Sequence, residues 1–155
     1  MNPAVAVGLY FAGILPLHDV AIRIVAQLAA ATIAIPLLSH FSLTAFAIPP
    51  SFATTAVDAG IIELFLTFVL MFCILVLSRI KWYSVRIVTI ACVIQALVYL
   101  GAPYTGALMN PMLGVAWELR YMTVSRVTLL VYAVAPTIGA MLACDVFHGV
   151  FGVKI

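Results

Sequence analysis

The tripeptide Met-Asn-Pro occurs twice in this chain, in "MNPAVAVG" (residues 1–8) and in "LMNPMLGVAW" (residues 108–117). Each copy precedes a short apolar run, and a long apolar segment follows later. Asn is a preferred N-cap residue, and Pro is favoured at the first helical position because that position needs no backbone N–H. Each copy therefore predicts the start of a helix, and the two starts lie 108 positions apart (109 against 1).

The composition is that of an integral, multi-pass membrane protein. The chain has 155 residues, 66% of them hydrophobic and 8% charged, and its mean hydropathy is +1.29. A soluble domain carries about 25% charged residues. Its three cysteines lie singly in apolar runs, and no nucleophile–base pair, metal-ligand cluster or phosphate loop is visible. We therefore expect no enzyme activity, no cofactor and no metal. The net charge of +2 is too small to indicate nucleic acid, so the lipid bilayer is the expected surrounding.

Four apolar segments are long enough to cross a bilayer, which takes about 20 residues. They cover approximately residues 20–38, 59–77, 85–102 and 127–147. The runs behind the two Asn-Pro pairs, residues 3–14 and 111–119, are too short to span and favour re-entrant half-helices. The sequence thus predicts one all-α membrane domain over residues 1–155, a helical bundle with two re-entrant half-helices and four full transmembrane spans.

The connection between the second and third spans carries Arg79, Lys81 and Arg86 and no acidic residue. Cytoplasmic loops have an excess of Lys and Arg, so this connection is predicted to face the cytoplasm or the equivalent side of an organelle membrane.

The two Asn-Pro units are predicted to be inverted copies of each other. Two spans precede the second unit, so that a full repeat would contain three spans. An odd number of spans inverts the second copy relative to the membrane. Inverted repeats with broken helices are a transport architecture with a site near the bilayer midplane. Half-helices that start there would direct the positive ends of their dipoles at one point, where Asn2 and Asn110 could donate hydrogen bonds to a passing oxygen. Such dipoles repel cations.

These motifs resemble those of the aquaporin family, also called major intrinsic proteins. "NPAVAVG" (2–8) is similar to the first Asn-Pro-Ala box, and "PYTGALMNPMLGVAW" (103–117) to the second box with its Thr-Gly lead-in. "ELFLTF" (63–68) and "RIVAQLAAA" (23–31) resemble motifs of the fourth and third spans of that family, and "VYAVAPTIGAMLA" (131–143) resembles one of the sixth.

The resemblance implies roles for individual residues. The pore motifs would be Asn2, Pro3 and Ala4 in the first box and Asn110, Pro111 and Met112 in the second. Glu63 would be a buried carboxylate that accepts hydrogen bonds from backbone N–H groups of the second re-entrant loop, and Gln27 a similar structural polar group.

The chain also departs from the family pattern. Met112 replaces the usual Ala, Leu113 occupies the position of the filter arginine, and Val98 and Ala107 fall on two further filter positions. The family has six spans, so the resemblance implies that this chain is truncated at its N-terminus and lacks the first two. In these departures the chain resembles the unorthodox, super-aquaporin branch of the family. The resemblance implies a location in an intracellular or organelle membrane.

Two functions remain open from the sequence. The paired motifs favour a passive channel for water or small neutral solutes, which by resemblance would be a homo-tetramer. The missing spans favour a non-conducting, aquaporin-derived structural subunit that packs with other membrane subunits in a larger complex.

Overall fold

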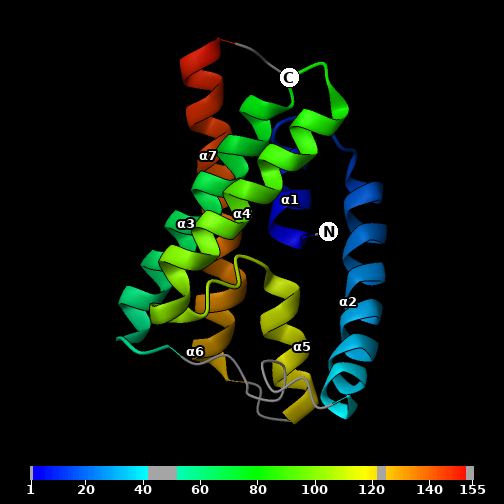
Figure 1. Cartoon of the computed structure of the whole chain (residues 1–155), viewed down its shortest axis with the longest axis vertical. Coiled ribbons are helices and arrows are strands. Elements are labelled where there is room, and N and C mark those ends of the chain that lie inside the picture. Colours follow the sequence, from blue (N-terminus) through cyan, green and yellow to red (C-terminus); the bar gives the residue numbers. More distant parts are fainter. Residues whose placement is uncertain (1, 42–51, 122–124, 153–155) are drawn as a thin grey trace.

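The computed structural model describes residues 2–41, 52–121 and 125–152, and this part of the chain contains helices and no strands (Figure 1). The predicted all-α fold class is therefore confirmed. The helices are α1 (Pro3–Phe11), α2 (Leu17–His40), α3 (Ala56–Leu77), α4 (Tyr83–Thr105), α5 (Pro111–Tyr121), and a continuous last helix made of α6 (Arg126–Leu129), the π-helical segment η2 (Leu130–Val134) and α7 (Ala135–Phe151).

Four of these helical segments are long and apolar enough to cross a membrane. They are Leu17–Leu37, Ala56–Leu77, Tyr83–Thr105 and Arg126–Phe151. By contrast, α1 has 9 residues and α5 has 11. At 1.5 Å per residue these two helices are about 14 and 17 Å long, roughly half of a 30 Å bilayer core.

The first half-helix ends earlier than predicted, at Phe11 instead of residue 14. Ala12 is its C-cap, and Gly13 has a φ of 74°, in the left-handed region that glycine enters without a steric penalty. The turn is closed by a hydrogen bond from Ile14 N–H to Leu9 O. The predicted helix was too long because Ile14 is apolar and continues the run. The backbone at Ile14 already turns toward α2.

The centre of the bundle is the contact between α3 and α7. A Cβ atom at Gly139 of α7 would lie 2.2 Å from the carbonyl oxygen of Leu64 in α3, so the two backbones touch there. The half-helix α1 lies against the same pair, with Ala4 and Ala12 packed on Met71 and Phe147. Small residues thus permit close helix approach, as is usual in membranes.

The second half-helix packs on α2. Ala116 and Trp117 of α5 form a small buried cluster with Ile35 of α2. In Figure 1, α2 stands on one side of the molecule, the α3, α4 and α7 helices stand on the other, and the two half-helices lie between them.

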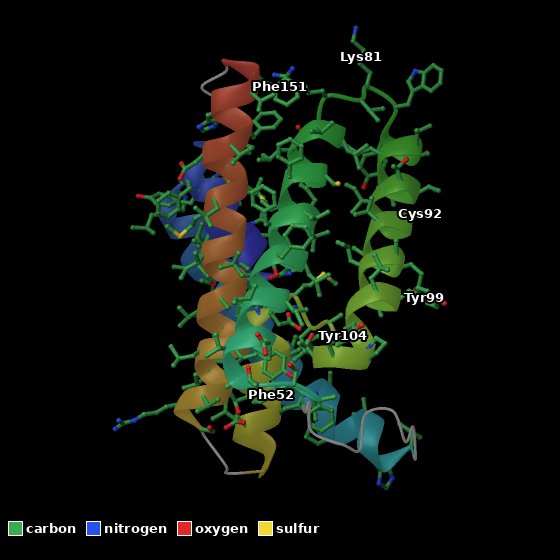
Figure 2. All side chains as sticks on the ribbon, turned by 90° about the vertical axis from the view of Figure 1, so that its left-hand side faces the viewer. Phe52, Lys81, Cys92, Tyr99, Tyr104 and Phe151 are labelled. Atoms are coloured by element: carbon green, nitrogen blue, oxygen red, sulfur yellow. The ribbon has the colours of Figure 1, made fainter. Side chains whose placement is uncertain are left out.

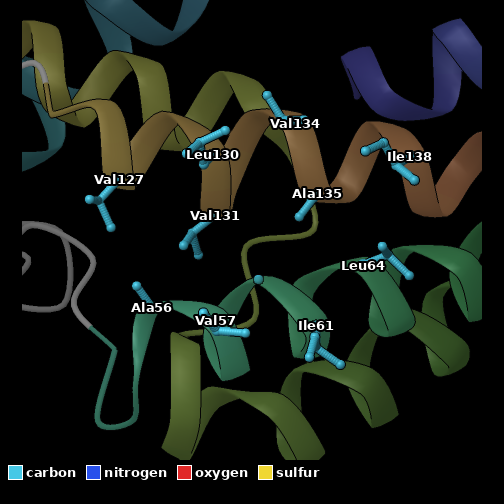
Figure 3. A pocket seen from close by; sticks show the side chains of 11 residues that line it. Ala56, Val57, Ile61, Leu64, Val127, Leu130, Val131, Val134, Ala135 and Ile138 are labelled. Atoms are coloured by element: carbon cyan, nitrogen blue, oxygen red, sulfur yellow. The ribbon is translucent and has the colours of Figure 1, made fainter.

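The outer surface of the bundle is apolar. Tyr99 of α4 is 80% exposed and lies with Cys92 on the side of α4 that faces away from α3 and α7 (Figure 2). A groove of about 360 Å³ runs between α3 and the last helix (Figure 3). Its lining residues are all apolar, including Val57, Ile61 and Val134, so this groove lacks the polar groups that a site for a polar solute needs.

Candidate pore site

Each Asn-Pro pair starts a half-helix in the same way. Asn2 has an extended backbone (φ −144°, ψ 123°), and its Oδ1 accepts a hydrogen bond of 2.9 Å from Ala4 N–H. Asn110 Oδ1 accepts one of 3.1 Å from Met112 N–H. Pro3 and Pro111 are the first residues of α1 and α5. The asparagines are therefore N-caps whose amide groups are held in a fixed orientation by their own helices.

The N-terminal ends of α1 and α5 lie next to each other. Asn2 Nδ2 donates a hydrogen bond to the carbonyl oxygen of Met109, the residue before Asn110. From this point α1 and α5 run toward opposite ends of the molecule (Figure 1). The positive ends of both helix dipoles, each equivalent to about half an elementary charge, thus converge on one place.

The loop before α5 has a strained backbone. Ala107 and Met109 have φ values of 49° and 47°, although neither is a glycine. The left-handed conformation costs an L-residue about 1–2 kcal/mol. Such strain persists only where the surroundings hold it in place.

Glu63 holds that loop. Its side chain is completely buried, and Oε1 accepts a hydrogen bond of 3.0 Å from Leu108 N–H while Oε2 accepts one of 2.7 Å from Met109 N–H. Bonds from N–H groups to a carboxylate are roughly twice as strong as bonds between neutral groups. Glu63 is thus buried and accepts backbone hydrogen bonds from the two residues that precede Asn110, which is the geometry that the resemblance implied.

Two further residues join Glu63, and the sequence analysis missed both. Thr105 donates from its hydroxyl to Glu63 Oε1 (2.7 Å) and accepts from Ala107 N–H (3.1 Å). Tyr132 donates from its hydroxyl to the carbonyl oxygen of Thr105 (2.7 Å). Both residues lie inside the quoted motifs, and each is a polar side chain in an otherwise apolar run, which was the available signal.

Two cavities lie next to the meeting point, one on the side of each asparagine. The cavity of about 80 Å³ is lined by Asn2, Arg23 and Gln27, and the cavity of about 240 Å³ by Gln27, Asn110 and Leu113, each with apolar neighbours. Gln27 lines both, and among the described residues neither its Nε2 nor its Oε1 has a hydrogen-bond partner. The structure thus places Gln27 across from the two asparagines. The structural role suggested for Gln27 stays a prediction.

The remaining predicted positions are divided between core and cavity. Pro3, Ala4 and Met112 are buried within the motif itself. Val98 and Ala107 lie in an apolar cluster with Leu66, Leu97 and Met109. Leu113 lines the larger cavity and is 36% exposed. Among the filter positions, Leu113 is therefore the one that the structure places beside Asn110.

Two opposed half-helices inside a bundle of membrane-length helices define a membrane channel fold. Residues 1–147 match the profile of the family described as major intrinsic protein. The chain belongs to this family of membrane channels.

Comparison with solved structures gives the same fold. The X-ray structure of the aquaglyceroporin from Plasmodium falciparum is similar with a TM-score of 0.80 at 22% sequence identity, over 94% of this chain and 70% of that chain. At this identity the likeness shows the fold alone. Comparison with curated protein sequences gives no match.

Proposed function

We propose that this protein is a passive channel for water and small neutral solutes. The observation that carries the proposal is the hydrogen bond from Asn2 to Met109, because it brings both helix starts and both asparagine amides to one point beside two cavities. An amide nitrogen has two N–H groups. Asn2 uses one for Met109, and the second can donate to the oxygen of a water or an alcohol in the cavity.

The electrostatics of the site favour neutral solutes. The converging dipole ends oppose the entry of a cation, including hydronium. A water whose oxygen accepts from a fixed amide directs both of its hydrogens away from that amide, which interrupts a proton-conducting chain. Because this barrier comes from α1 and α5 themselves, it does not depend on a charged filter residue.

The apolar side chain of Leu113 makes the proposed selectivity broad. An arginine at a constriction supplies donors that replace the hydration of a solute and a charge that excludes cations, and Leu113 supplies neither. We therefore expect proteoliposomes with the wild-type chain to pass both water and glycerol. Leu113→Arg should lower glycerol flux at least severalfold while water flux falls less, as measured by stopped-flow light scattering. Its larger side chain would narrow the cavity beside Asn110.

The matched control is Leu119→Arg, which makes the same change on α5 at a residue that lines neither cavity. This variant should leave the ratio of the two fluxes unchanged. A wild-type protein that passes water and strictly rejects glycerol would contradict the apolar-filter argument. Flux no higher than that of empty liposomes would contradict the channel proposal itself, and a non-conducting subunit would take its place.

We further propose that the channel assembles as a homo-tetramer. Support comes from the exposed apolar side chains of α3 and α4, such as Phe65 and Tyr99, which give a second copy a surface to pack on. Light scattering of the detergent-solubilised protein, corrected for bound detergent, measures the copy number directly.

A further inference from the structure

The connection between α3 and α4 concentrates positive charge at one end of the molecule. Arg79, Lys81 and Arg86 are three of the seven Lys and Arg residues of the whole chain, and they lie within eight positions. Lys81 extends from the tip of this connection, at the same end as Phe151 in α7 (Figure 2). The basic cluster, as we call these three residues, is thus next to the end of the last helix.

Arg79 is held in place by aromatic rings. Its Cζ lies 5.3 Å from the centroid of the Phe147 ring and 4.7 Å from that of the Phe151 ring. The two rings are themselves 4.8 Å apart, and Phe147 is almost completely buried. A guanidinium that interacts with ring faces through its charge can still donate N–H groups to a ligand. Arg79 therefore contacts two aromatic rings while it remains exposed.

The positive charge of the cluster is not neutralised within the described part of the chain. Arg79, Lys81 and Arg86 form no ion pair there. Arg86 lies over the ring of Tyr83, with its Cζ 5.5 Å from the centroid. The nearest acid on α7 in sequence, Asp145, lies before Phe147 and forms no ion pair with Arg79. Three cations without a carboxylate give this end of the molecule a net positive charge.

The surroundings of the cluster are those of a membrane interface. Trp82 and Tyr83 are 74% and 66% exposed, and aromatic side chains of this kind lie at the level of lipid headgroups. Trp82 is also the N-cap of α4 and provides no side-chain acceptor for the first N–H groups of that helix. These groups add a smaller attraction for negative charge.

We propose that the basic cluster binds the phosphate of an anionic phospholipid headgroup, with Arg79 as the main ligand. The Phe147 and Phe151 rings position its guanidinium, Lys81 and Arg86 add charge, and Trp82 and Tyr83 hold the connection at headgroup depth. The assignment is independent of conduction, because none of these residues lines the cavities beside Asn2 and Asn110.

The test uses Trp82 as a reporter within the binding site. The full chain with Trp117→Phe, so that Trp82 is its one tryptophan, is placed in phosphatidylcholine vesicles that contain equal amounts of phosphatidylglycerol. Either the phosphatidylglycerol or the phosphatidylcholine carries brominated acyl chains, which quench tryptophan at short range. The ratio of the two quenching efficiencies gives the preference for the anionic lipid. A basic residue near an anionic surface is worth a factor of about five in binding, so Arg79→Gln should lower the preference about fivefold.

Two further variants distinguish a specific site at Arg79 from a general attraction between positive charge and an anionic membrane. Phe151→Leu keeps every charge but removes a ring from Arg79, and it should lower the preference by at least twofold. Arg126→Gln removes an exposed arginine from α6 and should leave the preference unchanged. An unchanged preference in Arg79→Gln, or an equal loss in Arg126→Gln, would overturn the proposal.

Two further measurements test whether the ligand is a soluble phosphate compound and whether the Trp117→Phe substitution affects the result. Inorganic phosphate added to the vesicles should not reduce the preference, and if it abolishes the preference the ligand is a soluble phosphate compound instead of a lipid. Native mass spectrometry of chains that retain Trp117 counts bound phosphatidylglycerol, and fewer bound lipids in Arg79→Gln than in wild type are expected. Equal numbers in the two proteins would contradict the assignment.

Discussion

Glu63→Gln is expected to release the loop before α5 and to abolish flux through the protein. The substitution keeps the shape of the side chain but replaces one acceptor oxygen by an NH₂ group. Leu108 N–H, Met109 N–H and the Thr105 hydroxyl all donate to the carboxylate in the buried site, so at least one donor must lose its acceptor. Each buried donor left without a partner costs about 1–3 kcal/mol, and the strained Ala107 and Met109 lose their support.

The measurements are the midpoint of thermal unfolding in detergent and the water flux in proteoliposomes. A loss of about 3 kcal/mol corresponds to a midpoint lower by roughly 10 °C. Asp145→Asn makes the same acid-to-amide change at an exposed position of α7 and should affect neither quantity. Unchanged flux and an unchanged midpoint in Glu63→Gln would show that the carboxylate does not hold the loop.

Gly139→Ala is the second substitution with a large expected effect. The added Cβ would lie 2.2 Å from Leu64 O and 3.1 Å from Phe68 N, which are backbone atoms of α3. A backbone cannot rotate away as a side chain can, so α3 and α7 must separate. Inserting a single carbon atom into a packed core costs about 1–3 kcal/mol and occasionally more, and we expect the upper end of this range. Because Leu64 follows Glu63 directly, the separation should also disturb the loop before α5 and reduce flux.

Gly149→Ala provides a matched control on the same helix. A Cβ at Gly149 meets no atom within 4 Å. Alanine favours a helix over glycine by about 1 kcal/mol, so this variant should be equal to or slightly more stable than wild type. Equal stability of Gly139→Ala and Gly149→Ala would contradict a backbone contact between α3 and α7 at Gly139.

The paired motifs made much of this architecture predictable. Asn followed by Pro has one favoured role at a helix start, and two copies before short apolar runs imply two half-helices. Glu63 could be selected because a carboxylate in an apolar span must find hydrogen-bond donors within the protein. These predictions depend on local chemistry that a single residue carries wherever the chain folds.

Other features depend on contacts between distant segments and were not predictable in the same way. The stop of α1 at Phe11 is set by the backbone turn at Gly13, which an apolar run does not encode. Tyr132 joins the loop before α5 because η2 directs it there, and a π-helical turn leaves no clear periodic signal in five residues. The surroundings of Gln27 could not be predicted from its type, and in the part of the chain that the structure describes neither of its amide atoms has a hydrogen-bond partner.

The contacts of α1 also determine when the site can form during folding. Asn2 and its partner Met109 are 107 positions apart, and the Cys144 thiol that donates to Gly8 O lies 136 positions from it. A helix of nine residues is marginal by itself, and the buried residues packed on Ala4 and Ala12 come from α3 and α7. During synthesis the first half-helix is therefore made long before its partners. The contacts of α1 join residues far apart in sequence, so its docking against Met109 and against α7 is expected to be a late and slow step.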